Sequence, residues 1–276
     1  NVGLGTYALA LNTTGVSNLA IGHVALAENT TGNYNVGVGQ STLNGNTTGL
    51  RNTALGYGAL DVPDTENDNL AIGYDALGGS IAGGEYNVAI GNYSMDALTS
   101  GDKNTGVGYN TLTANTDGYE NTAIGHGSLK ENVGGNNNNA FGIASLANNT
   151  TGQLNTALGS EALKDNTTGS RNIAIGVKAL DAPDTENDNL AIGYDALGGS
   201  IAGGELNVAI GNYSLDALTS GDDNTAVGYQ ASSANTTGAH NVSLGSTAGV
   251  TITTGQDNVI IGSNSNPSAG GASNQI

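Results

Sequence analysis

The sequence predicts an all-β fold, a parallel β-roll or β-solenoid built from 17-residue coils. A motif of the form Asn-x-small-aliphatic-Gly opens sixteen successive units, from Asn1 to Asn258. Apolar and small residues alternate within the motif, which is typical of a short strand. A turn signal, often Asn-Thr-Thr-Gly, closes many units. A period this short indicates stacked coils in which each unit contacts its neighbours.

The first part of each unit is expected to be a strand. In the unit 155–171, counted from Asn155 as position 1, Thr156 and Leu158 hold positions 2 and 4, and Ala157 and Gly159 hold positions 3 and 5. We expect the larger residues at positions 2 and 4 to form the core. The small residues at positions 3 and 5 would form a smooth outer face.

The second part of each unit repeats a small residue followed by leucine, as in Ala25-Leu26 and Ser128-Leu129. This pair predicts a second short strand, and the turn signal after it supplies glycine where a positive φ is needed. One coil would then contain two strands and two turns. The recurrence of Gly and Asn argues against helix.

Identical residues at one position should stack into ladders along the coils. We expect the position-1 amides to bond the turns above and below, although local turn bonds would explain any single Asn equally well. The position-5 glycines should mark bends or close backbone approaches. The representative ladder residues are Asn18, Asn52, Asn121, Asn155, Gly22, Gly56, Gly125 and Gly159.

The chain divides into a shaft of fifteen coils, 1–257, and an irregular terminal segment, 258–276. Thirteen of the fifteen coils have 17 residues, and those that open at Asn69 and Asn189 have 18. A block at 52–120 recurs at 172–240, and within it 181–205 repeats 61–85 with a single change, Val62 to Ala182. The terminal segment departs from the repeat, so we expect the natural product to continue past Ile276 into a C-terminal region.

A coil with about three sizeable apolar side chains has a thin core, worth roughly 5–9 kcal/mol at ~1.5–3 kcal/mol per side chain. Backbone ordering costs ~1–2 kcal/mol per residue. A partner chain that covers the smooth face would strengthen every coil. We therefore expect a parallel homotrimer, with its chains intertwined or side by side.

The pattern Asn-x-Ala-Ile-Gly followed by Ala-Leu and Asn-Thr-Thr-Gly resembles the β-roll repeats of phage tail fibres and of trimeric autotransporter adhesin heads of the YadA type. The resemblance covers the whole chain. It implies a trimeric fibre at a virion or cell surface and provides no catalytic motif.

Composition restricts the possible partners. The net charge is −18 with only six Lys and Arg, which disfavours nucleic acid and anionic membranes. Cysteine is absent, which suits an extracellular or virion location, and no apolar run is long enough for membrane insertion. His23, His126 and His240 lie many coils apart, so they cannot cooperate, and we expect no enzyme activity.

The acidic turn of the duplicated block offers oxygen ligands of the kind that calcium prefers. The spacing is neither that of an EF-hand loop nor that of the Gly-rich nonapeptide of calcium β-rolls, and a solvated turn that keeps the chain soluble is the competing interpretation. Calcium is the one candidate cofactor. The residues are Asp61, Asp64, Glu66 and Asp68 in the first copy and Asp181, Asp184, Glu186 and Asp188 in the second.

Tyrosines recur at positions 6 and 7 of coils in the duplicated block, and they should stack into a stripe. Tyrosine beside Asp and Asn suits sugar rings, whereas packing between chains is the structural alternative. The stripe consists of Tyr57, Tyr74, Tyr93 and Tyr109 in the first copy and Tyr194, Tyr213 and Tyr229 in the second.

These observations predict a structural and adhesive fibre segment, from a tail fibre or a surface adhesin, that spaces and presents a receptor-binding region and contacts surface glycans. One alternative is an ice-binding or surface-binding solenoid, because Thr-Thr pairs recur in many coils. A second alternative is the head of a bacterial trimeric autotransporter.

Overall fold

The computed structural model describes residues 1–276 as two compact units, Asn1–Asn137 and Asn138–Ile276. Each unit contains eight three-residue strands and no helix. The strands of the first unit are β1 Val2–Leu4, β2 Leu19–Ile21, β3 Val36–Val38, β4 Thr53–Leu55, β5 Leu70–Ile72, β6 Val88–Ile90, β7 Thr105–Val107 and β8 Thr122–Ile124. Those of the second unit are β9 Asn139–Phe141, β10 Thr156–Leu158, β11 Ile173–Ile175, β12 Leu190–Ile192, β13 Val208–Ile210, β14 Thr225–Val227, β15 Val242–Leu244 and β16 Val259–Ile261.

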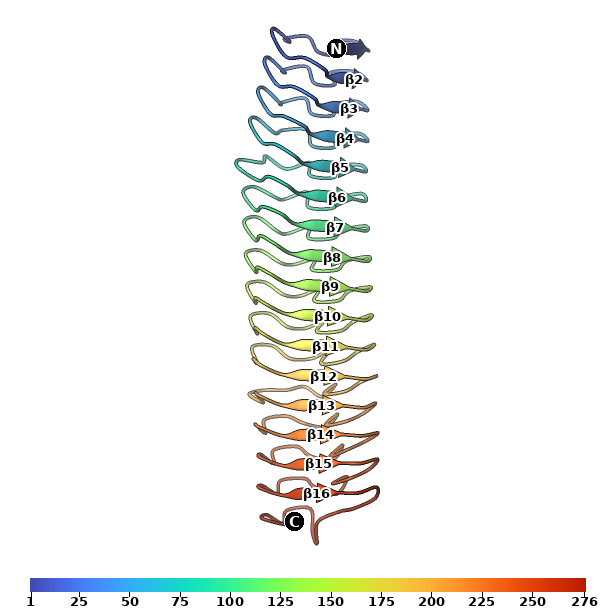
Figure 1. Cartoon of the computed structure of the whole chain (residues 1–276), viewed down its shortest axis with the longest axis vertical. Helices are drawn as coiled ribbons and strands as arrows, with labels where there is room; N and C mark the ends of the chain where they lie inside the picture. Colours follow the sequence, from blue (N-terminus) through green and yellow to red (C-terminus); the bar gives the residue numbers. More distant parts are fainter. The chain divides into compact units, whose positions relative to one another are not determined.

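Within each unit the strands pair in parallel and in chain order, one strand per coil (Figure 1). Equivalent positions face each other, so that Val2 pairs with Leu19 and Thr156 with Ile173. The two 18-residue coils keep this register, because Leu70 pairs with Val88 and Leu190 with Val208. The predicted parallel β-solenoid of roughly 17-residue coils is confirmed.

The second half of the coil differs from the prediction, because it contains no second strand. Residues at positions 7, 9 and 17 adopt positive φ, as at Val24, Leu26 and Ser17, with φ of 53°, 48° and 59°. Left-handed residues that alternate along the chain cannot form an extended strand. The coils still bond here, because the Leu26 N–H donates to the Thr42 carbonyl at 2.9 Å.

The two faces of the strand are also reversed relative to the prediction. Position 3 points inward: Ala20, Ala54 and Ala157 are fully buried. The aliphatic residues at positions 2 and 4 point outward, and Leu55 and Leu158 remain 47% and 48% exposed. The coil is so narrow that only small side chains fit at position 3.

Two contacts show how narrow the coil is. A methyl group added at Gly106 would lie 2.6 Å from Ser94 Oγ and 2.9 Å from Met95 Cε. The interior therefore consists of small residues at positions 3 and 8 and a large one at position 9, all without solvent exposure in most coils. The fully buried position-9 residues are Leu26, Leu43, Leu60, Leu77, Met95, Leu112, Leu129, Leu146, Leu163, Leu180, Leu197 and Leu215.

Candidate functional site: the duplicated acidic turn and the tyrosine ladder

The position-1 asparagines form a continuous network inside each unit. Asn18 Nδ2 donates to the Gly32 carbonyl at 2.7 Å, and Asn18 Oδ1 accepts the Asn35 N–H at 2.9 Å. Asn52, Asn121 and Asn155 make the same type of bond to the carbonyl at position 15. Each amide thus closes its own coil, and the Oδ1 of Asn18, Asn52 and Asn155 also holds the next coil.

The ladder glycines at position 5 occupy strained backbone that a side chain would not fit. Gly56 and Gly159 have φ of 134° and 142°, and Gly22 and Gly125 have 136° and 126°. A Cβ at Gly56 would overlap the carbonyl oxygen of Gly73 in the next coil. The glycines therefore allow neighbouring coils to pack backbone against backbone.

A second asparagine ladder lies at position 12, where the sequence analysis had recognised only a turn. Asn29 Nδ2 donates to Asn12 Oδ1 at 2.7 Å, and Asn46 Nδ2 donates to Asn29 Oδ1 at 2.8 Å. Asn166 and Asn149 pair in the same way at 2.8 Å. The recurrence of Asn at this position was visible in the sequence, and complete burial is what turns the turn residue into a ladder.

This second ladder is interrupted in the first three coils of each copy of the duplicated block and resumes in the fourth, where Asn115 Oδ1 accepts from Asn132 Nδ2 at 2.9 Å. Pro63, Ile81 and Leu98 are buried at the corresponding places of the first copy. Ile81 and Leu98 take the place of the position-12 asparagine, because they lie against the turn glycines Gly84 and Gly101 as the asparagines do in other coils. In the second copy Pro183 holds position 12 in the coil after that of Asn166. The buried Asn166 Oδ1 therefore has no hydrogen-bond partner. The block therefore replaces amides by an apolar interior.

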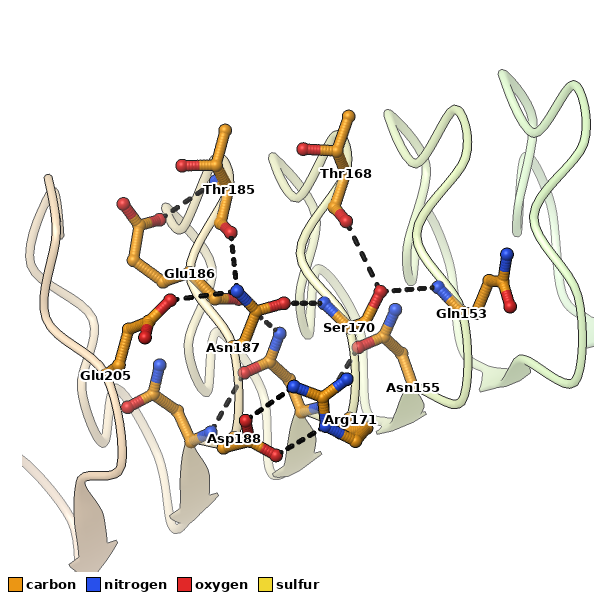
Figure 2. Close-up of polar contacts among 12 residues, drawn as sticks. Gln153, Asn155, Thr168, Ser170, Arg171, Thr185, Glu186, Asn187, Asp188 and Glu205 are labelled. Atoms are coloured by element: carbon orange, nitrogen blue, oxygen red, sulfur yellow. Dashed lines mark hydrogen bonds and ion pairs between the residues drawn. The ribbon is translucent and has the colours of Figure 1, made fainter.

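Buried glutamates Glu66 and Glu186 hold the turn of each copy, at the position where most coils have glycine. Glu186 Oε2 accepts the backbone N–H group of Thr185 at 3.0 Å (Figure 2). It also accepts that of Asp184 at 2.8 Å, and Oε1 accepts that of Gly203 at 2.8 Å. Glu66 makes the equivalent three bonds at 2.7, 3.0 and 2.9 Å. Each carboxylate thus joins its own turn to the next coil.

The turn also connects three coils through side chains on its outer side. Asn187 Oδ1 accepts the Ser170 N–H at 2.9 Å, and Asn187 Nδ2 donates to Glu205 Oε1 at 2.8 Å (Figure 2). Arg171 makes a bidentate pair with Asp188, at 2.7 Å for both bonds, and Arg51 pairs in the same way with Asp68 at 2.6 Å. The arginines lower the pKa of both aspartates.

The remaining acids of the turn have different surroundings. Asp64 and Asp184 bond the hydroxyls of Thr47 and Thr167. Asp61 is half-buried, its Oδ1 has no partner, and burial, followed by the charge of Asp75, raises its pKa. Burial also raises the pKa of its counterpart, Asp181.

Six of the eight predicted calcium ligands are therefore held by separate protein groups, and the Asp61 Oδ1 has no partner. No place in the chain brings together three or more His, Asp or Glu side chains in a metal-binding arrangement. Calcium binding stays a prediction of the sequence.

The tyrosine stripe is a ladder of rings in contact. Tyr57 and Tyr74 stack at a centroid distance of 5.2 Å and an interplanar angle of 10°. Tyr93 meets Tyr74 and Tyr109 edge to face, at 5.4 and 6.0 Å. His126, not predicted to belong to the stripe, stacks on Tyr109 at 5.4 Å.

The second copy of the ladder is shorter. Tyr213 meets Tyr194 and Tyr229 edge to face, at 5.4 and 6.2 Å. Val177 occupies the position that Tyr57 holds in the first copy, so the second copy has no stacked pair. Tyr74 and Tyr194 are both 43% exposed, and the rings are accessible to solvent.

The surface contains no detectable pocket, and no helix is present that could cross a membrane. Comparison with models of protein families, with curated proteins and with solved structures gave no match.

Proposed function

We propose that this chain is a segment of a structural and adhesive fibre on a virion or cell surface, assembled from parallel copies of itself. The observation that carries the proposal is the outer face of the sheet. Positions 2 and 4 of all sixteen strands hold Val, Leu, Ile, Thr, Phe or Asn and no charged residue. Within each unit these side chains line up in register and form an apolar stripe along the sheet.

Electrostatics favours this stripe as the contact between copies. The chain carries a net charge of −18, so two copies repel each other wherever their acidic surfaces meet. The stripe lacks charge, and its burial would remove half-exposed aliphatic side chains from water. A parallel arrangement lets equivalent coils meet along the stripe. We propose three copies, as the resemblance to β-roll fibres implies.

Sedimentation and light scattering test the assembly. Leu55→Glu and Leu158→Glu place a charge on the stripe at residues already about half exposed, so each single chain should keep its fold. The parent should be trimeric at micromolar concentration, and the double variant should dissociate. Thr48→Glu adds the same charge at an exposed turn and should leave the trimer intact. A monomeric parent, or a double variant that stays trimeric, would contradict the proposal.

We assign the adhesive contact to the tyrosine ladder and to sugars as its ligand. The rings present accessible edges and partly accessible faces beside Asp75 and Asn92, a combination that suits the apolar and hydroxyl parts of a sugar. The faces between Tyr57 and Tyr74 are already covered by the neighbouring ring, so a sugar would bind along the outside of the ladder.

Glycan-array binding tests this assignment. The double variant Tyr74→Ala, Tyr194→Ala should lose binding, because it interrupts both copies of the ladder. Tyr119→Ala removes a tyrosine of similar exposure, 46%, that lies outside the ladder, and it should bind as the parent does. Unchanged binding by the double variant would make the ladder a structural feature.

The ice-binding alternative has less support from the geometry. A column of threonines does recur at position 13, but the Thr30 and Thr150 hydroxyls donate to the carbonyls of Thr47 and Thr167 at 3.0 and 2.9 Å. Asp64 and Asp184 interrupt the column in each copy of the block. A fibre therefore agrees better with the arrangement than an ordered threonine surface does.

A further inference from the structure

The stacked pair Tyr57–Tyr74 differs from every other tyrosine–tyrosine contact in the chain. Its rings lie face to face, 5.2 Å apart and 10° from parallel, whereas the four remaining tyrosine pairs meet at 62° to 88°. The two residues hold position 6 of consecutive coils whose strands pair in parallel register, so the two side chains leave the backbone at equivalent places. Both side chains are accessible, at 48% and 43% exposure.

We propose that Tyr57 and Tyr74 form an oxidative cross-linking site, at which a carbon–carbon bond between the two rings joins the fourth and fifth coils covalently. The co-reactant is hydrogen peroxide, used by a haem peroxidase that takes one electron at a time. This proposal is independent of the fibre function, because it rests on the geometry of the pair alone.

The chemistry balances without any group supplied by the protein. Each phenol loses one electron and its hydroxyl proton, which gives two tyrosyl radicals whose unpaired spin is shared with the ring carbons beside the oxygen. Two of these carbons form the new bond. Each then releases its hydrogen as a proton, and each oxygen regains a proton as the rings become aromatic again. The net reaction consumes one peroxide, releases two waters and removes two hydrogen atoms from the protein.

The stacked geometry favours coupling within the pair over other outcomes. No hydrogen bond holds either hydroxyl, so the rings can turn about their side-chain bonds and bring the reacting carbons together. Edge-to-face neighbours such as Tyr74 and Tyr93 place the edge of one ring against the face of the other and must rotate much further. The second copy supplies a natural control, because Val177 stands where the partner of Tyr194 would be.

The sequence allows the products to be told apart after unfolding and cleavage at glutamate. The peptides 67–85 and 187–205 are identical and each contains a single tyrosine, Tyr74 or Tyr194. A Tyr57–Tyr74 bond joins 67–85 to 29–66. Coupling of Tyr74 to Tyr93 would join 67–85 to 86–120, and coupling of Tyr194 to Tyr213 would join 187–205 to 206–276. The other two edge-to-face pairs each lie within one peptide and would give an internal cross-link.

The experiment treats the purified chain with horseradish peroxidase and limiting peroxide, then measures dityrosine fluorescence and cross-linked peptides by mass spectrometry. The expected main product joins 29–66 to 67–85. In a mixture of ¹⁵N-labelled and unlabelled chains, both peptides of each cross-linked product should be labelled or both unlabelled, because the bond forms within one chain.

Two variants make the result specific. Tyr57→Phe keeps the stacked ring and removes the phenol, so the main product should disappear while the fold remains. Val177→Tyr creates a stacked pair in the second copy and should add a product that joins 162–186 to 187–205. Equal yields from stacked and edge-to-face pairs, a product that survives Tyr57→Phe, or mixed labels in the main product would each overturn the proposal.

Discussion

At the scale of single residues, the coil depends on backbone conformations that few side chains favour. Positions 7, 9 and 17 are left-handed in nearly every coil, and most of them are not glycine. A buried leucine at position 9 offsets this strain by packing in the core, as Leu60 does with φ of 48°. An exposed or half-exposed residue at position 7 has no such compensation. These sites are where single substitutions can stabilise the protein.

Val24 is the clearest case, because it is β-branched with φ of 53° at position 7. Val24→Asn should raise the free energy of unfolding by up to about 1 kcal/mol, since asparagine tolerates this region and other coils already have it there, as at Asn110. Val38→Asn makes the same chemical change within a strand and should be destabilising by up to about 1 kcal/mol. Denaturant unfolding of both variants checks the opposite signs.

The half-buried aspartates predict an acidic optimum of stability. Burial raises the pKa of Asp61 and Asp96 above the ordinary value of 3.8, so their protonated forms are favoured in the folded state. Stability should therefore increase as pH falls from neutral toward that value. Asp68 behaves in the opposite way, because Arg51 lowers its pKa and the stability it contributes is lost at still lower pH.

Melting temperatures measured from pH 7 to pH 3 test this sign. The parent should pass through a maximum on the acid side of neutrality. The double variant Asp61→Asn, Asp96→Asn should be more stable than the parent at pH 7 and should show a flatter rise. A parent whose stability only falls below pH 7 would contradict the assignment.

At the scale of elements, the coil is held by polar ladders as much as by its apolar interior. The position-1 amides run through every coil, whereas the position-12 amides are interrupted in three coils of each copy of the duplicated block, where a buried glutamate joins the turn to the next coil. Glu66 and Glu186 each accept three backbone N–H groups that no other group in the turn satisfies. The acidic turn is therefore a structural junction between a regular coil and the longer coil that follows.

Removal of the charge at this junction should be costly. Glu66→Gln leaves a buried turn with an amide group in place of one accepting oxygen, and we expect a loss of about 1–3 kcal/mol in the free energy of unfolding. Glu120→Gln is the matched control, because Glu120 is exposed and pairs only with Lys103 at 3.2 Å. Its effect should be near zero, and equal losses for the two variants would contradict the role of Glu66.

At the scale of the whole molecule, the charge is distributed very unevenly. The net charge is −18, each of the six Lys and Arg lies near an acidic partner, and the outer face of the strands carries no charge. The excess of carboxylates therefore repels itself along the turns. Folding brings these groups closer together than they are in the unfolded chain, so the repulsion opposes folding.

Salt should consequently stabilise the protein. Raising NaCl from about 10 to 150 mM shortens the screening length from about 30 to 8 Å and should increase the melting temperature. Calcium at matched ionic strength then tests the acidic turn. A larger rise of the melting temperature in calcium than in NaCl would support calcium ligation. An equal rise would mean that the acidic residues of the turn bind only groups of the protein.

The sequence by itself determined the period, the strand at the start of each coil, the parallel register and the duplication. These follow from repetition, because identical units stacked in order can pair only with equivalent positions aligned. Alternation in a strand defines two faces but does not say which is inside. The tertiary structure decided that, since the tight left-handed turns around Leu26 and Leu60 leave an interior too narrow for more than Ala or Gly at position 3 in nearly every coil.

The same reason explains the rest. Asn29 and Glu66 look like turn residues in the sequence. Burial of the turn places Asn29 in a ladder of amides and lets Glu66 hold the backbone of two coils. The acidic residues are close in sequence but bind different groups. Asp64 and Asp68 contact the preceding coil, whereas Glu66 holds its own turn and the next coil. Tyrosine spacing predicted a stripe, whereas the stacking of Tyr57 on Tyr74 depends on side-chain orientation, which the three-dimensional packing sets.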